Sequence, residues 1–374
     1  MKHRVIDCHA HFFPPAAGAS GFPDTATHLL HQQRAMHVHG NQPYRRKRDD
    51  TIVSERPLWD PKDPSPTGRR DANFRVGRYG RFEWSANGDD QYVQFLPPEM
   101  DDLSMTPEKL IASMDYAGVD AAFLQNDHIY GNLGEDFAAA TKKYPGRFVF
   151  SAQVEEAFAY RDDELLRLDH QISKLGAGAV YFTTTGMFRS GYKPMHSDKL
   201  YDPFWRAIEK SGVPISWVQS ANSPVGTYED EMNHLETIVE RFPGIRHVLV
   251  HGVPTGLYAD DKDKLNIPAV IKRLIASGKV FSEILYPIGW GGKMEYPYPR
   301  AHTHIRQLID LFGADRFMWG SDMPNVARYC TYAQSLNYFT KYSDYLSDAE
   351  RDGILYGNAL KIYPAFAKLE AIAG

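Results

Sequence analysis

The chain has 374 residues, of which 43% are hydrophobic and 13% aromatic, so it can bury a large core and is not a disordered protein. A formal net charge of −5 excludes the strongly basic balance of a nucleic-acid-binding protein. Its two cysteines are too few for a disulfide framework, and no run of residues predicts a signal peptide or a membrane span. We therefore expect a cytoplasmic protein without nucleic-acid or membrane partners.

An apolar strand is predicted at residues 5–8, within the run Val-Ile-Asp7-Cys-His9-Ala-His11. Because side chains alternate along a strand, we expect Asp7, His9 and His11 to point to the same side. Two imidazoles placed in this way can bind one divalent ion, and imidazole suits Zn and Mn among other metals. The pair of histidines therefore predicts a metal site at the end of the first strand.

Residues 12–105 break the regular pattern and are rich in Pro, Gly, Asp and Arg. No strong periodicity predicts helices or strands there, although aromatic residues such as Trp59 and Trp84 argue against disorder. We interpret this segment as an insertion after the first strand. We expect it to cover the C-terminal mouth of the fold and to contribute to a homodimer contact.

From Thr106 onward, short β-rich runs alternate with helical patterns. With residues 5–8 there are eight predicted strands, the others at residues 119–125, 148–154, 178–183, 213–218, 247–250, 280–284 and 317–319. Strands that alternate with helices pair in parallel, and eight such units close a barrel. The sequence thus predicts one α/β domain over residues 1–374, a (β/α)8 TIM barrel, with a doubly wound open sheet as the alternative.

Two further residues are predicted at the C-terminal mouth of this barrel. The eighth strand ends in Gly320-Ser-Asp322 and lies beside the first in a closed barrel, so Asp322 can complete a site with His9 and His11. The alternative for Asp322 is a helix cap or a turn. His251 ends the sixth strand, where it is a metal ligand, a general acid or base, or a structural histidine.

Several motifs together resemble one enzyme family. They lie at residues 7–14, 144–148, 251–252, 320–324 and 357–359. The sequence resembles the amidohydrolase superfamily, and within it the branch of 2-amino-3-carboxymuconate-6-semialdehyde decarboxylase and γ-resorcylate decarboxylase. The resemblance covers most of the chain outside the insertion, and it implies a divalent metal at the barrel mouth.

One position departs from the pattern of that family. The family has a metal-binding histidine at the end of the fifth strand, where this sequence has Gln219. A glutamine oxygen is a poorer zinc ligand than imidazole, so three alternatives follow. Gln219 binds the metal weakly, His251 replaces it as a ligand, or the site works without a metal; we favour a retained ion, Zn or Mn.

Further side chains near strand ends are candidates for substrate binding. They are Asp127, His128, Thr184, Asn222, Glu283, Trp290 and Arg328. Of these, Arg328 can hold a substrate carboxylate by a bidentate pair of hydrogen bonds. Glu283 needs a partner if it is buried at the end of the seventh strand.

The resemblance implies non-oxidative decarboxylation of a small aromatic or enol-bearing carboxylic acid, with His251 and Asp322 as catalytic residues. The first alternative is a metal-dependent hydrolase that attacks a lactone, an amide or a C–C bond next to a ketone with an activated water. The second alternative is a degenerate member of the family that binds a ligand without catalysis. Gln219, in place of the family's metal-binding histidine, is the feature that supports this alternative.

Overall fold

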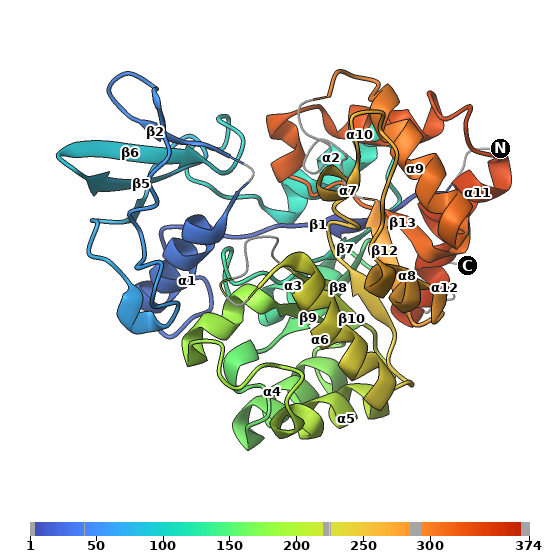
Figure 1. Ribbon diagram of the computed structural model, residues 1–374, viewed down its shortest axis with the longest axis horizontal. Helices are drawn as coiled ribbons and strands as arrows, with labels where there is room; N and C mark the ends of the chain where they lie inside the picture. Colours follow the sequence, from blue (N-terminus) through green and yellow to red (C-terminus); the bar gives the residue numbers. More distant parts are fainter. Residues whose placement is uncertain (1–3, 41, 220–223, 225, 285–293, 368–374) are drawn as a thin grey trace.

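A sheet of eight parallel strands forms the centre of the molecule (Figure 1). The computed structural model describes residues 4–40, 42–219, 224, 226–284 and 294–367. The strands are paired in chain order, and each of the eight predicted strands is confirmed. They are β1 (Ile6–Ala10), β7 (Ala121–Leu124), β8 (Phe148–Gln153), β9 (Ala179–Thr183), β10 (Ile215–Val218), β11 (His247–Leu249), β12 (Val280–Ile284) and β13 (Phe317–Trp319).

The first and last strands meet and close the sheet into a barrel. Ala10 and Met323 form a parallel bridge, and the amide of His11 donates to the Met323 carbonyl at 2.7 Å. The amide of Asp322 donates to the His9 carbonyl at 2.8 Å. This closure excludes the doubly wound sheet, in which the first and last strands would not meet, and it confirms the predicted barrel.

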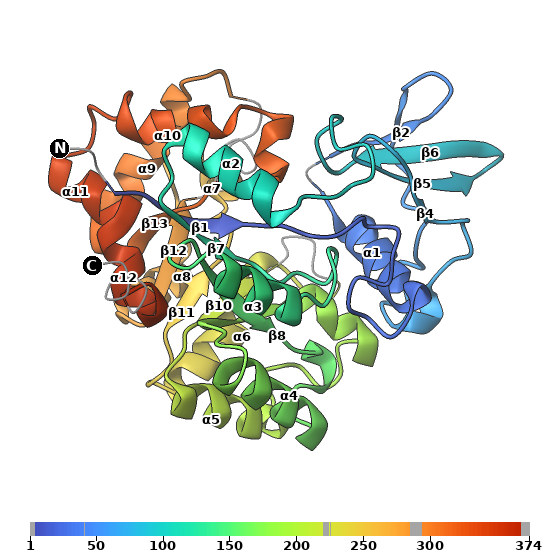
Figure 2. The same ribbon diagram turned by 180° about the vertical axis from the view of Figure 1, so that it is seen from behind.

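Helices surround the barrel and cover the outer faces of its strands (Figure 2). They are α2 (Pro107–Ala117), α3 (Gly134–Lys143), α4 (Asp162–Ser173), α5 (Asp202–Ser211), α6 (Tyr228–Arg241), α7 (Thr255–Tyr258), α8 (Ala269–Ala276), α9 (Pro299–Phe312), α10 (Tyr332–Thr340), α11 (Asp348–Asp352) and α12 (Asn358–Ile362). Among the described helices, none combines the length and the apolar character that a membrane crossing requires.

Local sequence signals explain where these elements begin and end, as α2 illustrates. The Thr106 side chain accepts a hydrogen bond from the amide of Lys109, and Pro107 occupies the first helical position. Gly118 ends the helix with a φ of 84°, a left-handed conformation that glycine adopts without strain. Leu110 and Met114 are fully buried, so the helix presents one apolar face to the sheet.

Residues 12–105 contain regular structure that the sequence pattern did not predict. They form α1 (Thr25–Val38) and an antiparallel sheet of β2 (Tyr44–Arg46), β3 (Ile52–Val53), β4 (Arg75–Val76), β5 (Arg81–Ala86) and β6 (Asp89–Gln94). The sheet stands apart from the barrel, at the upper left of Figure 1. Helix α1 escaped prediction because it buries polar residues, including His28, Gln32 and Arg34, and has no apolar stripe.

The prediction that Asp7 shares a side of β1 with the two histidines was wrong. The pairing of β1 with β7 shifts register between Asp7 and Ala10, so simple alternation fails there. The Asp7 carboxylate instead accepts hydrogen bonds from the amide and hydroxyl of Ser321, at 2.8 and 2.5 Å, and from the Tyr332 hydroxyl at 2.6 Å. Asp7 therefore ties β1 to the segment that follows β13.

We predict that Asp7→Ala lowers the free energy of unfolding by about 3 kcal/mol or more, because it leaves buried donors on Ser321 and Tyr332 without an acceptor. Urea denaturation followed by circular dichroism measures the loss. Asp120→Ala is the matched control, since the exposed side chain of Asp120 accepts from the amide of Val5, next to the start of the same strand. A loss of about 1 kcal/mol or less in both variants would contradict the role given to Asp7.

Candidate active site

A cavity of about 210 Å³ opens at the C-terminal ends of the barrel strands. Its polar wall includes His9, His11, His251 and Asp322, which lie in or just after three different strands of the barrel. Barrel enzymes place their active sites at this end, because loops after several strands converge there. The volume suits a small ligand.

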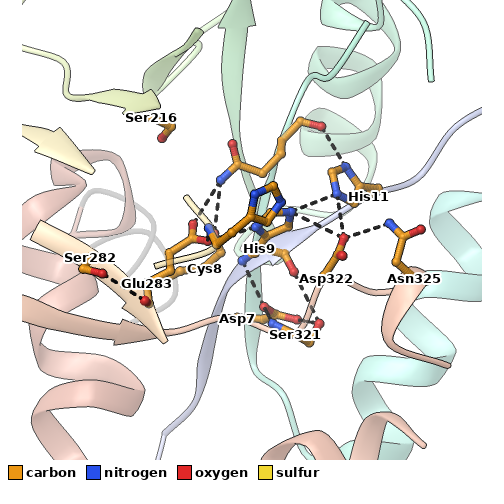
Figure 3. A network of polar contacts seen from close by, with 12 residues as sticks. Asp7, Cys8, His9, His11, Ser216, Ser282, Glu283, Ser321, Asp322 and Asn325 are labelled. Atoms are coloured by element: carbon orange, nitrogen blue, oxygen red, sulfur yellow. Dashed lines mark hydrogen bonds and ion pairs between the residues drawn. The ribbon is translucent and has the colours of Figure 1, made fainter. Parts of the chain in front are cut away.

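His9, His11 and Asp322 point toward one another at the floor of this cavity (Figure 3). His9 Nε2 lies 3.0 Å from His11 Nε2, and Asp322 Oδ1 lies 3.5 and 3.2 Å from these two atoms. All three side chains are buried. The structure thus brings together three residues that the sequence analysis singled out, from positions more than three hundred residues apart.

The hydrogen bonds around this cluster determine where its protons can lie. His11 Nδ1 is 3.1 Å from the Gln125 carbonyl oxygen, which can only accept, so the neutral ring carries its proton on Nδ1. His11 Nε2 is then an acceptor that faces a second acceptor, Asp322 Oδ1. When His9 donates from Nδ1 to Glu283, at 2.9 Å, its Nε2 is a third acceptor. Three converging lone pairs of this kind are suited to a cation.

Glu283 lies behind His9 and supports it. One of its carboxylate oxygens contacts His9 Nδ1, and the other accepts from the Gln125 side chain at 3.2 Å. Burial raises the pKa of Glu283 to about 8, against the opposing effect of His251. Burial also lowers the pKa of His9 to about 4. Both shifts favour neutral groups in the metal-free protein, and the contact fixes the orientation of the His9 ring.

Asp322 is held in place by Asn325 on η7 (Asn325–Arg328), which also contacts Tyr130 in the segment after β7. The Asn325 side chain donates to Asp322 Oδ1 at 2.8 Å and to the Tyr130 hydroxyl at 2.6 Å. Burial alone would raise the pKa of Asp322, but its contacts with the histidines hold that pKa well below its usual range. The carboxylate is therefore ionised at neutral pH.

His251 and Asp322 have backbone conformations that side chains other than glycine rarely adopt. Their φ angles are 66° and 62°. Such left-handed residues cluster at functional sites, where the surrounding structure stabilises the strained backbone. The His251 ring lies 5.3 Å from the His9 ring, and burial together with His9 lowers the pKa of His251 to about 4.

Gln219 is buried at the end of β10 and lines the same cavity. Neither its amide nitrogen nor its amide oxygen has a hydrogen-bond partner among the described residues. Buried polar groups normally have partners, so this side chain is available to a ligand.

The other predicted residues fall into three groups. Asp127, His128 and Arg328 line the cavity. Thr184 and Glu283 do not line it: the Thr184 hydroxyl is buried, and Glu283 contacts His9 from behind. Asn222 and Trp290 lie outside the described residues.

The cavity also has a wall that the sequence analysis missed. The insertion contributes His31, Met36, His39 and Phe95 to it. The three histidines of α1 were a signal for this wall, but no spacing connects them to the barrel motifs. Only the folded chain places His31 beside His128, and His39, which follows α1, near Arg328.

Comparison with known proteins places the chain in a family. The amidohydrolase family model matches residues 6–365. The chain belongs to the amidohydrolase family. As a member it is an enzyme, and the predicted resemblance to this superfamily is confirmed. No curated protein matches the sequence.

Solved structures share the fold of this amidohydrolase at low sequence identity. A candidate 2-pyrone-4,6-dicarboxylic acid hydrolase from Pseudomonas putida is 15% identical, with a TM-score of 0.58 over 98% of this chain and 99% of that one. A 2,6-dihydroxybenzoate decarboxylase from Rhizobium is 16% identical, with a TM-score of 0.51 over 70% and 89%. A dihydroxybenzoic acid decarboxylase from Polaromonas sp. JS666, with bound manganese, is 15% identical, with a TM-score of 0.50 over 70% and 87%.

His128 forms a second buried ion pair of the amidohydrolase cavity. Its Nε2 atom lies 2.7 Å from the carboxylate of Glu156, and both side chains are buried. Burial alone would lower the pKa of His128, but Glu156, Glu155 and Asp127 raise it from 6.5 to about 8. The ring is therefore an imidazolium at neutral pH.

We predict that this ion pair makes the stability depend on pH. The pKa of His128 is higher in the folded chain than in the unfolded chain. The contribution of the ion pair to the free energy of unfolding is therefore fully present below about pH 6.5 and is lost as the pH rises through about 8. A shift of this size corresponds to about 2 kcal/mol. Melting temperatures of the chelator-treated protein between about pH 6 and about pH 9.5 measure it.

The double variant His128→Asn with Glu156→Gln provides the comparison, because it keeps a neutral pair at the same place. We expect its melting temperature to change less over this pH range than that of the wild type. Equal pH dependence in the two proteins would contradict the assignment of the charge to His128.

Proposed function

We propose that His9, His11 and Asp322 bind one divalent ion, zinc or manganese, with Gln219 as a further ligand or a substrate contact. The support is chemical: two imidazole nitrogens and a carboxylate oxygen lie within 4.8 Å of one another, and no proton lies between His11 Nε2 and Asp322 Oδ1 when His11 is neutral. Two imidazoles and one carboxylate suit zinc and related metals. A neighbour in the comparison contains manganese.

The substrate that this cavity suits best is a small aromatic carboxylic acid. Phe95, Tyr130 and Phe188 give the cavity aromatic walls that can pack against a ring. Arg328 lies at the same cavity, and its guanidinium contacts the carbonyls of Asn325 and Gln94. In the described part of the chain no carboxylate pairs with Arg328, so it can bind a carboxylate of the substrate. Asp127 is a further contact.

We propose non-oxidative decarboxylation as the reaction. When bound, the divalent ion supplies positive charge that stabilises negative charge developing on the substrate. His251 takes up a proton from solvent as a transient imidazolium and gives that proton to the ring carbon that bears the carboxylate, and a C–H bond forms. The C–C bond then breaks, carbon dioxide leaves, and the electron pair of that bond restores the aromatic ring.

Two properties of His251 support this role. Its ring lies next to His9 at the cavity wall, within reach of a ligand that contacts the cluster. Burial and His9 destabilise its charged form, so a proton on this ring is readily transferred. Asp322 remains ionised beside it and stabilises the transient imidazolium.

Hydrolysis is the second candidate, and a different observation favours it. A candidate pyrone dicarboxylate hydrolase is among the solved structures that share the fold over nearly the whole chain. A neutral His251 also suits a general base that takes a proton from an attacking water. The two reactions use the same residues and differ in the product.

We predict a graded loss of metal affinity in variants of the cluster. Glu283→Gln weakens binding of zinc or manganese by about 10- to 100-fold, because it disturbs the support of His9 without removing a ligand. His9→Ala with His11→Ala abolishes stoichiometric binding. Metal content after dialysis, measured by mass spectrometry, tests both.

The exposed residue His170 serves as a control, since His170→Ala removes an imidazole far from the cluster. Its metal content should equal that of the wild type. Stoichiometric metal in the double-alanine variant would refute the proposed ligands. If the wild type binds no metal, the protein is better described as a degenerate family member that binds a ligand without catalysis.

We predict that the manganese- or zinc-loaded protein releases carbon dioxide from a hydroxybenzoate. The assay uses a panel of mono- and dihydroxybenzoates, with 2-pyrone-4,6-dicarboxylate as the test of hydrolysis and the His9→Ala with His11→Ala variant as the inactive control. Carbon dioxide release that the control lacks supports decarboxylation. Ring opening of the pyrone without carbon dioxide release would establish hydrolysis instead.

A further inference from the structure

A second group of polar side chains lies around two histidines of the cavity wall, and the proposed reaction does not use it. His31 comes from α1 of the insertion, and His128 follows β7. Glu155 and Glu156 follow β8, and Arg189 belongs to η3 (Thr184–Ser190) after β9. We call these five residues the His31–His128 cluster. It joins the insertion to three strands of the barrel.

The cluster is built around the ion pair of His128 and Glu156. The second oxygen of Glu156 accepts from the amide of Thr183 at 3.0 Å, so the carboxylate is fixed on both sides. Gly186 makes room for it, because a Cβ atom at this position would lie 2.1 Å from Glu156 Oε2. A glycine in the cavity wall thus permits the carboxylate to reach His128.

His31 is fixed by aromatic stacking. Its ring is parallel to that of His128 within 10°, with centroids 4.6 Å apart, and Phe22 stacks on it at 5.0 Å. Burial, His128 and Arg189 lower the pKa of His31 well below its ordinary value. A neutral ring therefore stacks on a charged one, and both line the cavity.

Several polar atoms of the cluster have no hydrogen-bond partner among the described residues. They are His31 Nε2, His128 Nδ1, Glu155 Oε1 and Arg189 Nε, all of them buried. The Glu155 carboxylate lies 3.9 Å from Nε2 of the neutral His31 ring and 3.5 Å from Arg189 Nε, and neither separation allows a good hydrogen bond. Buried polar atoms normally have partners, and two of these four atoms belong to side chains that line the cavity, His31 and His128.

The protonation states indicate what kind of partner is absent. The His128 imidazolium has two N–H donors and uses one of them on Glu156. Its Nδ1–H needs an acceptor, and the Arg189 guanidinium has only donors. An oxygen atom that accepts hydrogen bonds would satisfy the His128 Nδ1–H and the Arg189 guanidinium, whereas Glu155 Oε1 needs a donor such as a hydroxyl group.

We propose that His31 and His128 form a second substrate subsite, which binds an oxygen substituent other than the reacting carboxylate. This rests on the proposed function, in which the reacting end of the substrate lies at His9, His11 and Asp322. The substituent is a carboxylate or a hydroxyl group, both of which provide an acceptor oxygen. The substrate is then a benzoate with a second polar group, and residues of the insertion contribute to its selection.

Binding of three acids to the manganese-loaded protein tests the subsite by isothermal titration calorimetry. Benzoate has only the first group, 3-hydroxybenzoate adds a hydroxyl, and isophthalate adds a carboxylate. We expect at least one of the two substituted acids to bind the wild type about tenfold more tightly than benzoate, or better. The acid that gains affinity identifies the substituent.

The variant His128→Asn with Glu156→Gln should reduce this preference to less than about twofold and leave the affinity for benzoate unchanged. His31→Phe is a second variant, which keeps the stack but removes the ring nitrogens, and it should reduce the preference as well. His196→Asn is the control, since this buried histidine lies outside the cavity lining. It should keep the wild-type preference.

The outcomes separate the two proposals. The subsite is overturned if the wild type binds all three acids with equal affinity, or if the folded variants keep the preference for a substituted acid. In either case, binding of benzoate still supports the proposed function. Failure of the wild type to bind any of the acids would overturn both. A preference lost in His31→Phe supports the subsite even if the double variant does not fold.

Discussion

The structure depends on the contact between the first and the eighth strand. Main-chain hydrogen bonds join His9 to Asp322, and the Asp7 carboxylate holds the segment after β13 through Ser321. The same few residues that close the sheet carry the side chains at the floor of the cavity. The stability of the barrel and the geometry of the site are therefore coupled where these two strands meet, because a change in their pairing would also move Asp322 relative to His11.

Much of the barrel was predictable because its signals are local. Each strand is a short apolar run between glycine or proline punctuation, and helix starts such as Thr106-Pro107 follow general capping rules. His9, His11 and Asp322 could be assigned to one site once eight strands were counted, since closure of a barrel places the first and the eighth strand side by side. The orientation of Asp7 was not predictable, because a register shift in β1 leaves no mark in the sequence.

The insertion was harder to predict for a physical reason. Its helix α1 buries His28, Gln32 and Arg34 in hydrogen bonds and ring contacts, so hydrophobic periodicity, the main helix signal, is absent. Its strands are short and belong to a small sheet outside the barrel. The general pattern of barrel strands and loops does not predict which residues of this segment line the cavity. Residues such as His31 and His39 can be connected to the site only through three-dimensional structure.

The left-handed backbone at His251 and Asp322 has a consequence for mutagenesis. Asparagine, aspartate and glycine tolerate such torsion angles better than alanine or β-branched residues do. An alanine scan at these two positions would therefore mix a conformational penalty with the loss of a functional group. Asparagine at position 322 retains the local fold and removes only the negative charge, which makes it the more informative replacement.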